Sequence, residues 1–211
     1  ANKEHRFLVQ DIAHQVDVSC SLLLEPAARN TAAAMAAAAL NAEPDQLLLF
    51  LPADHYIPDA EAFEQTIREG AAVAQQGAWV TFGVQPTSPS SAYGYIQAQG
   101  SGRVLSVSRF IEKPTTEKAM TYLASGNYYW NAGIFLLRAD TLLNALQTHA
   151  PDILSAVKQA VKQQHGDAQC RYLDEAAFRQ CRAESIDFAV LEHYSAINML
   201  AFNGLWSDVG S

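Results

Sequence analysis

Five polar clusters in this 211-residue sequence stand at the ends of apolar segments, where their side chains could bind a ligand. They are Glu25–Thr31, Pro52–His55, Glu112–Pro114, Tyr128–Ala132 and Trp206–Asp208. In an open parallel sheet, ligands bind beyond the carboxyl ends of the strands, so five clusters at one predicted edge indicate a site. The net charge is −8, so an anionic ligand would need a local group of N–H donors, cations or a metal ion.

Each of these polar residues also has a purely structural interpretation. Asp54 and Asp208 are typical of turns and helix caps, and Asn131 could satisfy turn amides. Glu112–Lys113 could be a solvated ion pair, with Pro114 only beginning a helix. The other two structural interpretations are a surface charge for Arg29 and core packing for Tyr128–Trp130.

Several classes of protein are excluded by what the sequence lacks. It has no G-x-S-x-G, Walker A or G-x-G-x-x-G motif, and its six histidines show no zinc-binding spacing. The acidic balance argues against a nucleic-acid-binding protein. The longest apolar runs, Ala32–Leu40 and Leu47–Leu51, are too short to span a membrane. Cys20, Cys170 and Cys181 form no C-x-x-C pair and suit a reducing compartment, so we expect a cytoplasmic protein.

The hydrophobic pattern predicts alternating strands and helices. The expected strands are Cys20–Leu24, Gln46–Leu51, Trp79–Val84, Tyr95–Ala98, Arg103–Ile111, Gly133–Leu137 and Ile197–Phe202. The expected helices are Phe7–Val16, Thr31–Asn41, Asp59–Gln76, Thr116–Ser125, Asp140–Thr148, Pro151–Gln164, Asp174–Arg182 and Asp187–His193. Strands 46–51 and 79–84 are almost wholly apolar, as in parallel sheets buried on both faces. We therefore expect one α/β domain over residues 1–211, with a doubly wound, mostly parallel Rossmann-like sheet and helices on both faces.

Seven motifs in order carry a family resemblance over nearly the whole chain. They are Leu24–Ala32 (with Glu25-Pro26 and Arg29-Asn30-Thr31), Leu51–His55, Phe82–Ile96, Phe110–Pro114, Trp130–Phe135, Ser185–Ala189 and Trp206–Ser211. The set closely resembles the bacterial mannose-1-phosphate guanylyltransferases, which are sugar nucleotidyltransferases. The resemblance implies that GTP and mannose 1-phosphate give GDP-mannose and pyrophosphate with the help of Mg²⁺, and it leaves a homo-oligomer open.

The resemblance also implies roles for individual residues. Asp54 and Asp208 match the family's metal ligands, and Lys113 matches the lysine that contacts the sugar phosphate. These three are the expected catalytic residues. Glu112 and Asn131 match groups that bind sugar hydroxyls. Two further positions are assigned to the sugar site: Gly94, which has no side chain to block the sugar, and Asp187.

The resemblance implies that the base of the nucleotide is recognised at Glu25. Guanine presents two adjacent N–H donors that a carboxylate can accept in parallel, whereas uracil and thymine suit an amide. Glu25 therefore favours guanine. Arg29 and Asn30 are expected to support this loop or the nucleotide.

One part of the family pattern is absent from these 211 residues. The family opens with a Gly-rich loop that ends in a lysine and wraps the nucleotide phosphates, and nothing here matches it. We therefore expect a segment truncated at both ends that has no guanylyltransferase activity alone. The alternatives are a pyrophosphorylase for another sugar or base, and an inactive nucleotide-sensing homologue.

Overall fold

The computed structural model describes residues 1–209, which divide into two compact units. Unit 1 comprises Ala1–Glu43 and Leu143–Val190, and unit 2 comprises Pro44–Leu142 and the chain from Leu191 onward. The last two residues of the Trp206–Ser211 motif lie outside the described residues.

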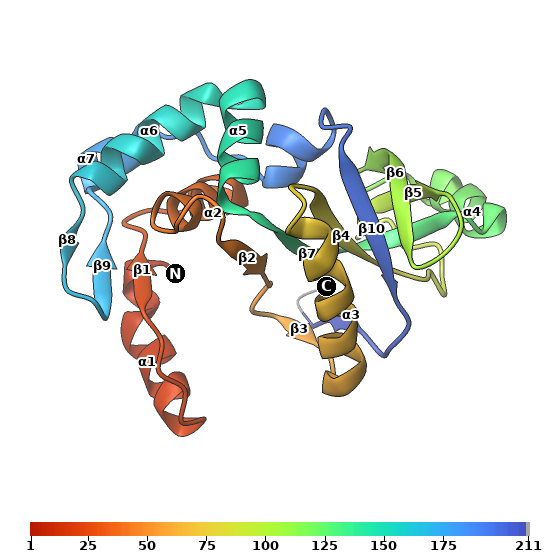
Figure 1. The fold of residues 1–211 in the computed structure, drawn as a ribbon, viewed down its shortest axis with the longest axis horizontal. Coiled ribbons are helices and arrows are strands. Elements are labelled where there is room, and N and C mark those ends of the chain that lie inside the picture. The colour runs from red at the N-terminus through yellow and green to blue at the C-terminus, as the bar shows by residue number, and fades with distance from the viewer. Residues whose placement is uncertain (210–211) are drawn as a thin grey trace. The chain divides into compact units, whose positions relative to one another are not determined.

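Unit 1 combines helices with a small sheet. The helical elements include η1 (Lys3–His5), α1 (Arg6–Gln15), α2 (Asn30–Leu40), α6 (Pro151–Lys162) and α7 (Glu175–Arg179). α5 (Ala139–His149) begins in unit 2 and continues in unit 1 from Leu143. The strands are β1 (Leu22–Leu24), β8 (His165–Gly166) and β9 (Cys170–Tyr172), in the order β1-β9-β8. β1 and β9 run side by side in parallel, with Leu22 opposite Cys170 (Figure 1).

The alanine-rich sequence of α2 explains its place in unit 1. Its buried residues are Ala32, Ala33, Met35, Ala36, Ala37 and Ala39. Such small side chains favour a helix and allow another helix to approach closely. That helix is α6, which contacts α2 and buries Ile153, Leu154 and Val157.

Unit 2 is built on a six-stranded sheet with the order β2-β7-β4-β10-β6-β5, in which β5 also pairs with β7. The strands are β2 (Leu47–Phe50), β4 (Trp79–Val84), β5 (Tyr95–Gln99), β6 (Val104–Ile111), β7 (Tyr128–Arg138) and β10 (Ile197–Phe202). A separate two-stranded ribbon joins β3 (His55–Tyr56) to β11 (Ser207–Asp208).

Two helices pack against this sheet. α3 (Ala60–Ala74) lies across β4, β7 and β10 (Figure 1), and Asp59 caps it by accepting from the Ala62 amide at 3.1 Å. α4 (Thr116–Ser125) contacts β7, where Tyr122 stacks on Tyr128 with ring centroids 4.2 Å apart. Both helices join the same apolar cluster, so they cover one face of the sheet.

The expectation of a mostly parallel, doubly wound sheet is wrong. Within the six-stranded sheet, β4 with β10 is the parallel pair, and β2–β7, β4–β7, β6–β10, β5–β6 and β5–β7 are antiparallel. Only residues 100–103 connect β5 to β6, which is too short for a parallel crossover. Burial on both faces, which Trp79–Val84 does show, identifies a central strand but does not fix the direction of its neighbours.

The predicted boundaries are observed unchanged for one helix and two strands. α4 has the predicted bounds Thr116–Ser125. β4 and β10 have the predicted bounds, whereas β7 begins at Tyr128 and so includes residues that were expected to precede it. The helix expected over Asp187–His193 is a short π-helix, η2 (Asp187–Leu191). None of the helices in the described part of the chain combines the length and apolar character needed to cross a bilayer.

Candidate functional site

Two aspartates from distant parts of the sequence meet in unit 2. Asp54 follows β2, and Asp208 lies in β11, where it is opposite His55 in the ribbon. The Val209 amide donates to the Asp54 carbonyl oxygen at 3.0 Å, which extends the pairing. One potential metal-ligand atom from each of Asp54, His55 and Asp208 lies within 4.8 Å of the others.

These two carboxylates fit a divalent metal ion. Mg²⁺ holds its ligands about 2.1 Å away, so two ligands of one ion are up to about 4.2 Å apart. The ligand atoms of Asp54, His55 and Asp208 all lie within 4.8 Å of one another, so small side-chain movements would let both carboxylates reach one ion. Asp54 is exposed and Asp208 is half-buried, which leaves room for water or phosphate oxygens. Hard oxygen ligands of this kind suit Mg²⁺.

His55 makes a specific contact beside the carboxylates. The indole Nε1 of Trp206 donates to His55 Nδ1 at 3.2 Å, and the two rings meet edge to face with centroids 5.2 Å apart. Burial lowers the pKa of His55, although the negative charges of Asp208 and Asp54 act in the opposite direction. The accepted hydrogen bond and the burial both favour the neutral imidazole.

Three of the expected sugar-binding residues also meet in unit 2. A Cβ atom built on Gly94 would lie 2.6 Å from Glu112 Oε2 and 3.5 Å from Asn131 Cβ. The backbone N–H of Asn131 donates to the Gly94 carbonyl oxygen at 2.8 Å. The side-chain Oδ1 of Asn131 accepts from the backbone N–H of Gly133 at 3.1 Å. Glycine at position 94 is therefore required for the Glu112 carboxylate to occupy its place.

Aromatic packing connects the sugar-binding candidates to the carboxylate pair. Tyr93, the neighbour of Gly94, contacts Trp130 and Trp206 with centroid distances of 5.0 and 5.4 Å. Trp206 in turn contacts His55. We call Tyr93, Trp130 and Trp206 the aromatic cluster. It holds residues from three segments of unit 2 in one packed group.

Lys113 follows β6 directly after Glu112. Its side chain is exposed, and its backbone has φ +41°, a left-handed conformation that residues other than glycine seldom adopt. Backbone strain of this kind often accompanies functional sites. The strain is a second feature, besides the Glu-Lys-Pro motif, that distinguishes Lys113 from an ordinary surface lysine.

The expected nucleotide-binding residues lie in unit 1, at the connection between β1 and α2. Glu25 is half-buried, and burial raises the pKa of its carboxyl group. Arg29 donates to the Arg179 carbonyl oxygen at 2.9 Å, which ties this connection to the end of α7. Asn30 begins α2 at φ +63°, and its Oδ1 accepts from the Thr31 amide at 2.8 Å.

Asp187 belongs to unit 1 and begins η2. The preceding Ile186 amide donates to Thr31 Oγ1 at 2.9 Å, so the chain leading into Asp187 is fixed to the start of α2. Asp187 therefore lies in a different compact unit from Gly94, Glu112 and Asn131.

The fold divides the predicted site residues between the two units, and the sequence analysis misses two residues beside Asp54 and Asp208. Unit 2 holds Asp54, Gly94, Glu112, Lys113, Asn131 and Asp208, and unit 1 holds Glu25, Arg29, Asn30 and Asp187. His55 and Trp206 were not assigned a role. Their positions, next to Asp54 and two residues before Asp208, were the available signal.

Comparison with known proteins supplies the family. The model of a family described as nucleotidyl transferase matches residues 1–211. The chain belongs to the nucleotidyl transferase family. Members of this family generally use a divalent metal ion, which agrees with the chemistry of the Asp54–Asp208 pair.

Curated relatives of this nucleotidyl transferase chain match all of it. The xanthan biosynthesis protein XanB of Xanthomonas campestris pv. campestris strain B100 is 45% identical over 215 residues, which cover 100% of this chain and 46% of XanB. A mannose-1-phosphate guanylyltransferase of Escherichia coli K12 is 41% identical over 222 residues, with the same coverage. The chain therefore spans about half the length of the curated relatives it matches.

Solved structures agree with the nucleotidyl transferase fold. The crystal structure of mannose-6-phosphate isomerase from Helicobacter pylori has a TM-score of 0.92 at 34% identity, covering 99% of this chain and 82% of that one. The crystal structure of mannose-1-phosphate geranyltransferase from Thermus thermophilus has a TM-score of 0.83 at 30% identity, covering 100% of this chain and 60% of that one.

Proposed function

We propose that this chain is the nucleotidyltransferase domain of an enzyme that transfers GMP from GTP to mannose 1-phosphate. The products are GDP-mannose and pyrophosphate. The observation that carries the proposal is the grouping, within unit 2, of the Asp54–Asp208 pair with Gly94, Glu112 and Asn131. The names of relatives at 41–45% identity, which concern mannose 1-phosphate guanylyl transfer and polysaccharide synthesis, support the same substrates.

The reaction requires positioning and neutralisation of charge. An oxygen of mannose 1-phosphate bonds to the α-phosphorus of GTP, while the bond from that phosphorus to the departing pyrophosphate breaks. Mg²⁺, when bound, supplies positive charge that offsets the charge developing on the phosphate oxygens. Asp54 and Asp208 would hold the ion, and Lys113 would place a cation beside the sugar phosphate. These residues orient the reactants, and none of them needs to transfer a proton.

The sugar and the base are assigned to different groups of residues. Glu112 and Asn131 would bind neighbouring hydroxyls of mannose, with Gly94 leaving the space they need and Asp187 as a further contact. Glu25 would accept the two N–H donors of guanine.

Arg29 and Asn30 would hold the loop that carries Glu25. The Arg29–Arg179 and Asn30–Thr31 hydrogen bonds support this indirect role. A cytoplasmic location also belongs to the proposal, and it agrees with three free cysteines, Cys20, Cys170 and Cys181.

The proposal is tested by measuring product formation with the complete protein that carries this chain. GTP and mannose 1-phosphate, with and without Mg²⁺, should release pyrophosphate in step with the appearance of GDP-mannose. UTP, dTTP or ATP in place of GTP, or glucose 1-phosphate in place of mannose 1-phosphate, should give far less product. A clear preference for another base or sugar would overturn the assigned substrates. Nucleotide binding without any turnover would indicate a sensing homologue.

A further inference from the structure

The imidazole of His55 is held by a neighbour that can only donate a hydrogen bond. Indole nitrogen carries a proton and has no lone pair to offer, so His55 Nδ1 must accept in its 3.2 Å contact with Trp206. Trp206 is only 9% exposed, and its contacts with Tyr93 and Trp130 hold the indole within the aromatic cluster. The hydrogen bond therefore belongs to the packed interior of unit 2.

This bond determines what His55 can offer to a metal ion. With Nδ1 as an acceptor, the proton of the neutral ring resides on Nε2. One nitrogen of His55 lies within 4.8 Å of the ligand oxygens of Asp54 and Asp208. If that nitrogen is Nδ1, its lone pair is engaged by Trp206. If it is Nε2, it carries the proton. In both cases His55 has no lone pair to give.

We propose that Trp206 is a specificity-determining residue for the metal ion, because its hydrogen bond prevents His55 from acting as a metal ligand beside Asp54 and Asp208. The inference rests on the proposed metal-binding role of Asp54 and Asp208. With His55 withheld, the protein ligands are oxygen atoms alone, which favour hard ions such as Mg²⁺. With His55 released, the site would offer two carboxylates and an imidazole.

A third ligand of this kind would change the preferred metal. Zn²⁺ binds imidazole well and commonly takes three protein ligands in catalytic sites. Mg²⁺, in contrast, prefers carboxylate and water oxygens to imidazole nitrogen. If the imidazole were free to bind a metal, Zn²⁺ would therefore compete with Mg²⁺ for this site.

The aromatic cluster supplies a matched control for this inference. Trp130 is buried like Trp206 and packs against it, with ring centroids 6.5 Å apart. Its indole Nε1 has no hydrogen-bond acceptor among the described residues. Trp130→Phe therefore removes an indole from the same cluster without changing the partner of His55.

The experiment compares the affinities of the complete protein for Zn²⁺ and Mg²⁺ by calorimetry. Trp206→Phe should raise the ratio of Zn²⁺ to Mg²⁺ affinity by about 10- to 100-fold, the range typical of changes around metal ligands. Trp130→Phe should leave the ratio unchanged. Adding His55→Gln to Trp206→Phe should return the ratio to the wild-type value. An unchanged ratio in folded Trp206→Phe protein would overturn the inference.

A second measurement on the wild-type protein does not depend on any tryptophan variant. Nitrogen NMR of labelled histidine, with His55→Gln used to assign the signal, should show the tautomer protonated on Nε2. The tautomer protonated on Nδ1 would overturn the inference even if the variants fail to fold. Failure of the proposed function is distinguishable, because Asp54→Asn would then leave Mg²⁺ binding as strong as in the wild type.

Discussion

Glu25 is the residue on which the choice of base depends in this account. Replacing its carboxylate with an amide removes an acceptor for one of the two guanine N–H groups. Glu25→Gln should therefore reduce kcat/KM for GTP. The ratio of kcat/KM for GTP to that for other nucleotides should fall by up to roughly 10⁴-fold, the discrimination found where a buried polar group is left without a partner. Kinetics with GTP and UTP measure this effect. Glu4→Gln, at an exposed position in the same unit, should change neither value. Unchanged preference in Glu25→Gln would make Glu25 a turn residue only.

Glu112 allows the sugar assignment to be tested separately from the base. Its carboxylate lies against Gly94 at the edge of the unit 2 sheet. Glu112→Gln should raise the KM for mannose 1-phosphate by about tenfold, the cost of roughly one charged hydrogen bond, while the KM for GTP changes little. Glu117→Gln, on the exposed side of α4, is the matched control. Equal increases in both Michaelis constants would contradict the assignment.

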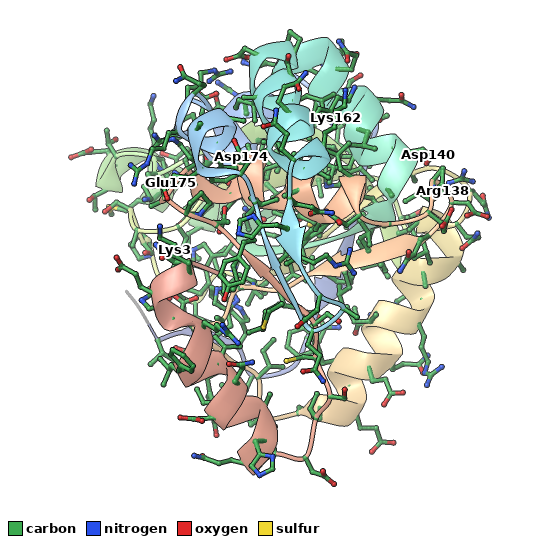
Figure 2. The ribbon with its side chains drawn as sticks, turned by 90° about the vertical axis from the view of Figure 1, so that its left-hand side faces the viewer. Lys3, Arg138, Asp140, Lys162, Asp174 and Glu175 are labelled. Carbon is green, nitrogen blue, oxygen red and sulfur yellow. The ribbon has the colours of Figure 1, made fainter. Side chains whose placement is uncertain are left out.

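The junction of β7 and α5 shows how an ion pair stabilises an element boundary. Figure 2 shows Arg138 and Asp140 pointing toward one another, with Arg138 Nε donating to Asp140 Oδ1 at 3.0 Å. This contact holds the pKa of Asp140 below its ordinary 3.8. Asp140 also lies in the first turn of α5, where a negative charge is favourable.

Asp140→Asn should lower the free energy of unfolding by about 0.5–1 kcal/mol at pH 7, since the pair is partly exposed. The folded-state pKa is lowered, so this stabilisation is present above pH 3.8 and is lost as the pH falls through the lowered pKa. Denaturation by urea at several pH values should show wild type and variant converging below pH 3.8. Glu64→Gln in the more exposed Arg68–Glu64 pair should cost less at pH 7. A gap between wild type and Asp140→Asn that persists at pH 2 would exclude this explanation.

Gly83 marks the irregularity in the pairing of β4 with β7. A Cβ atom there would lie 2.4 Å from Met199 Sδ and 2.9 Å from Tyr129 Cβ. Gly83→Ala should therefore destabilise the protein by about 1–3 kcal/mol through overpacking. In a Met199→Ala background the same substitution should cost less, because the sulfur is gone. Equal costs in both backgrounds, measured by thermal unfolding, would show that Met199 is not the obstacle.

The sequence predicts elements better than it predicts their direction. Hydrophobic pattern and length identify β4 and β10 at their observed bounds, because local composition decides whether a buried segment is extended. Direction depends on which strands meet, and the short β5–β6 connection was the available sign of an antiparallel pair.

The grouping of Gly94, Glu112 and Asn131 does not depend on the direction of β7. The beginning of antiparallel β7 lies at the same edge of the sheet as the end of β6, since Tyr95 pairs with both Trp130 and Ile111. Gly94, Glu112 and Asn131 therefore lie close together, although β7 runs in the other direction. The hydrogen bond from Trp206 to His55 could not be predicted, because it joins distant segments of the chain.

At the scale of the whole chain, the candidate residues are divided between two compact units. Unit 1 carries the residues expected to bind the nucleotide, together with Asp187. Unit 2 carries the Asp54–Asp208 pair and the other sugar-binding candidates. The changes in activation free energy caused by Glu25→Gln and Glu112→Gln should therefore add, because the two residues are assigned to different substrates. The effects of substitutions at Asp54 and Asp208 should not add, since these two residues are expected to bind the same ion.

The most direct test is a double-mutant cycle of Asp54→Asn and Asp208→Asn, measured as turnover of GTP and mannose 1-phosphate by the complete protein. Each single variant should lose roughly 10²- to 10³-fold in kcat while its thermal unfolding stays close to the wild type. The double variant should be no slower than the slower single variant, because either substitution already disables the shared ion. Wild-type turnover in either single variant, or losses that multiply in the double variant, would contradict a single two-carboxylate metal site.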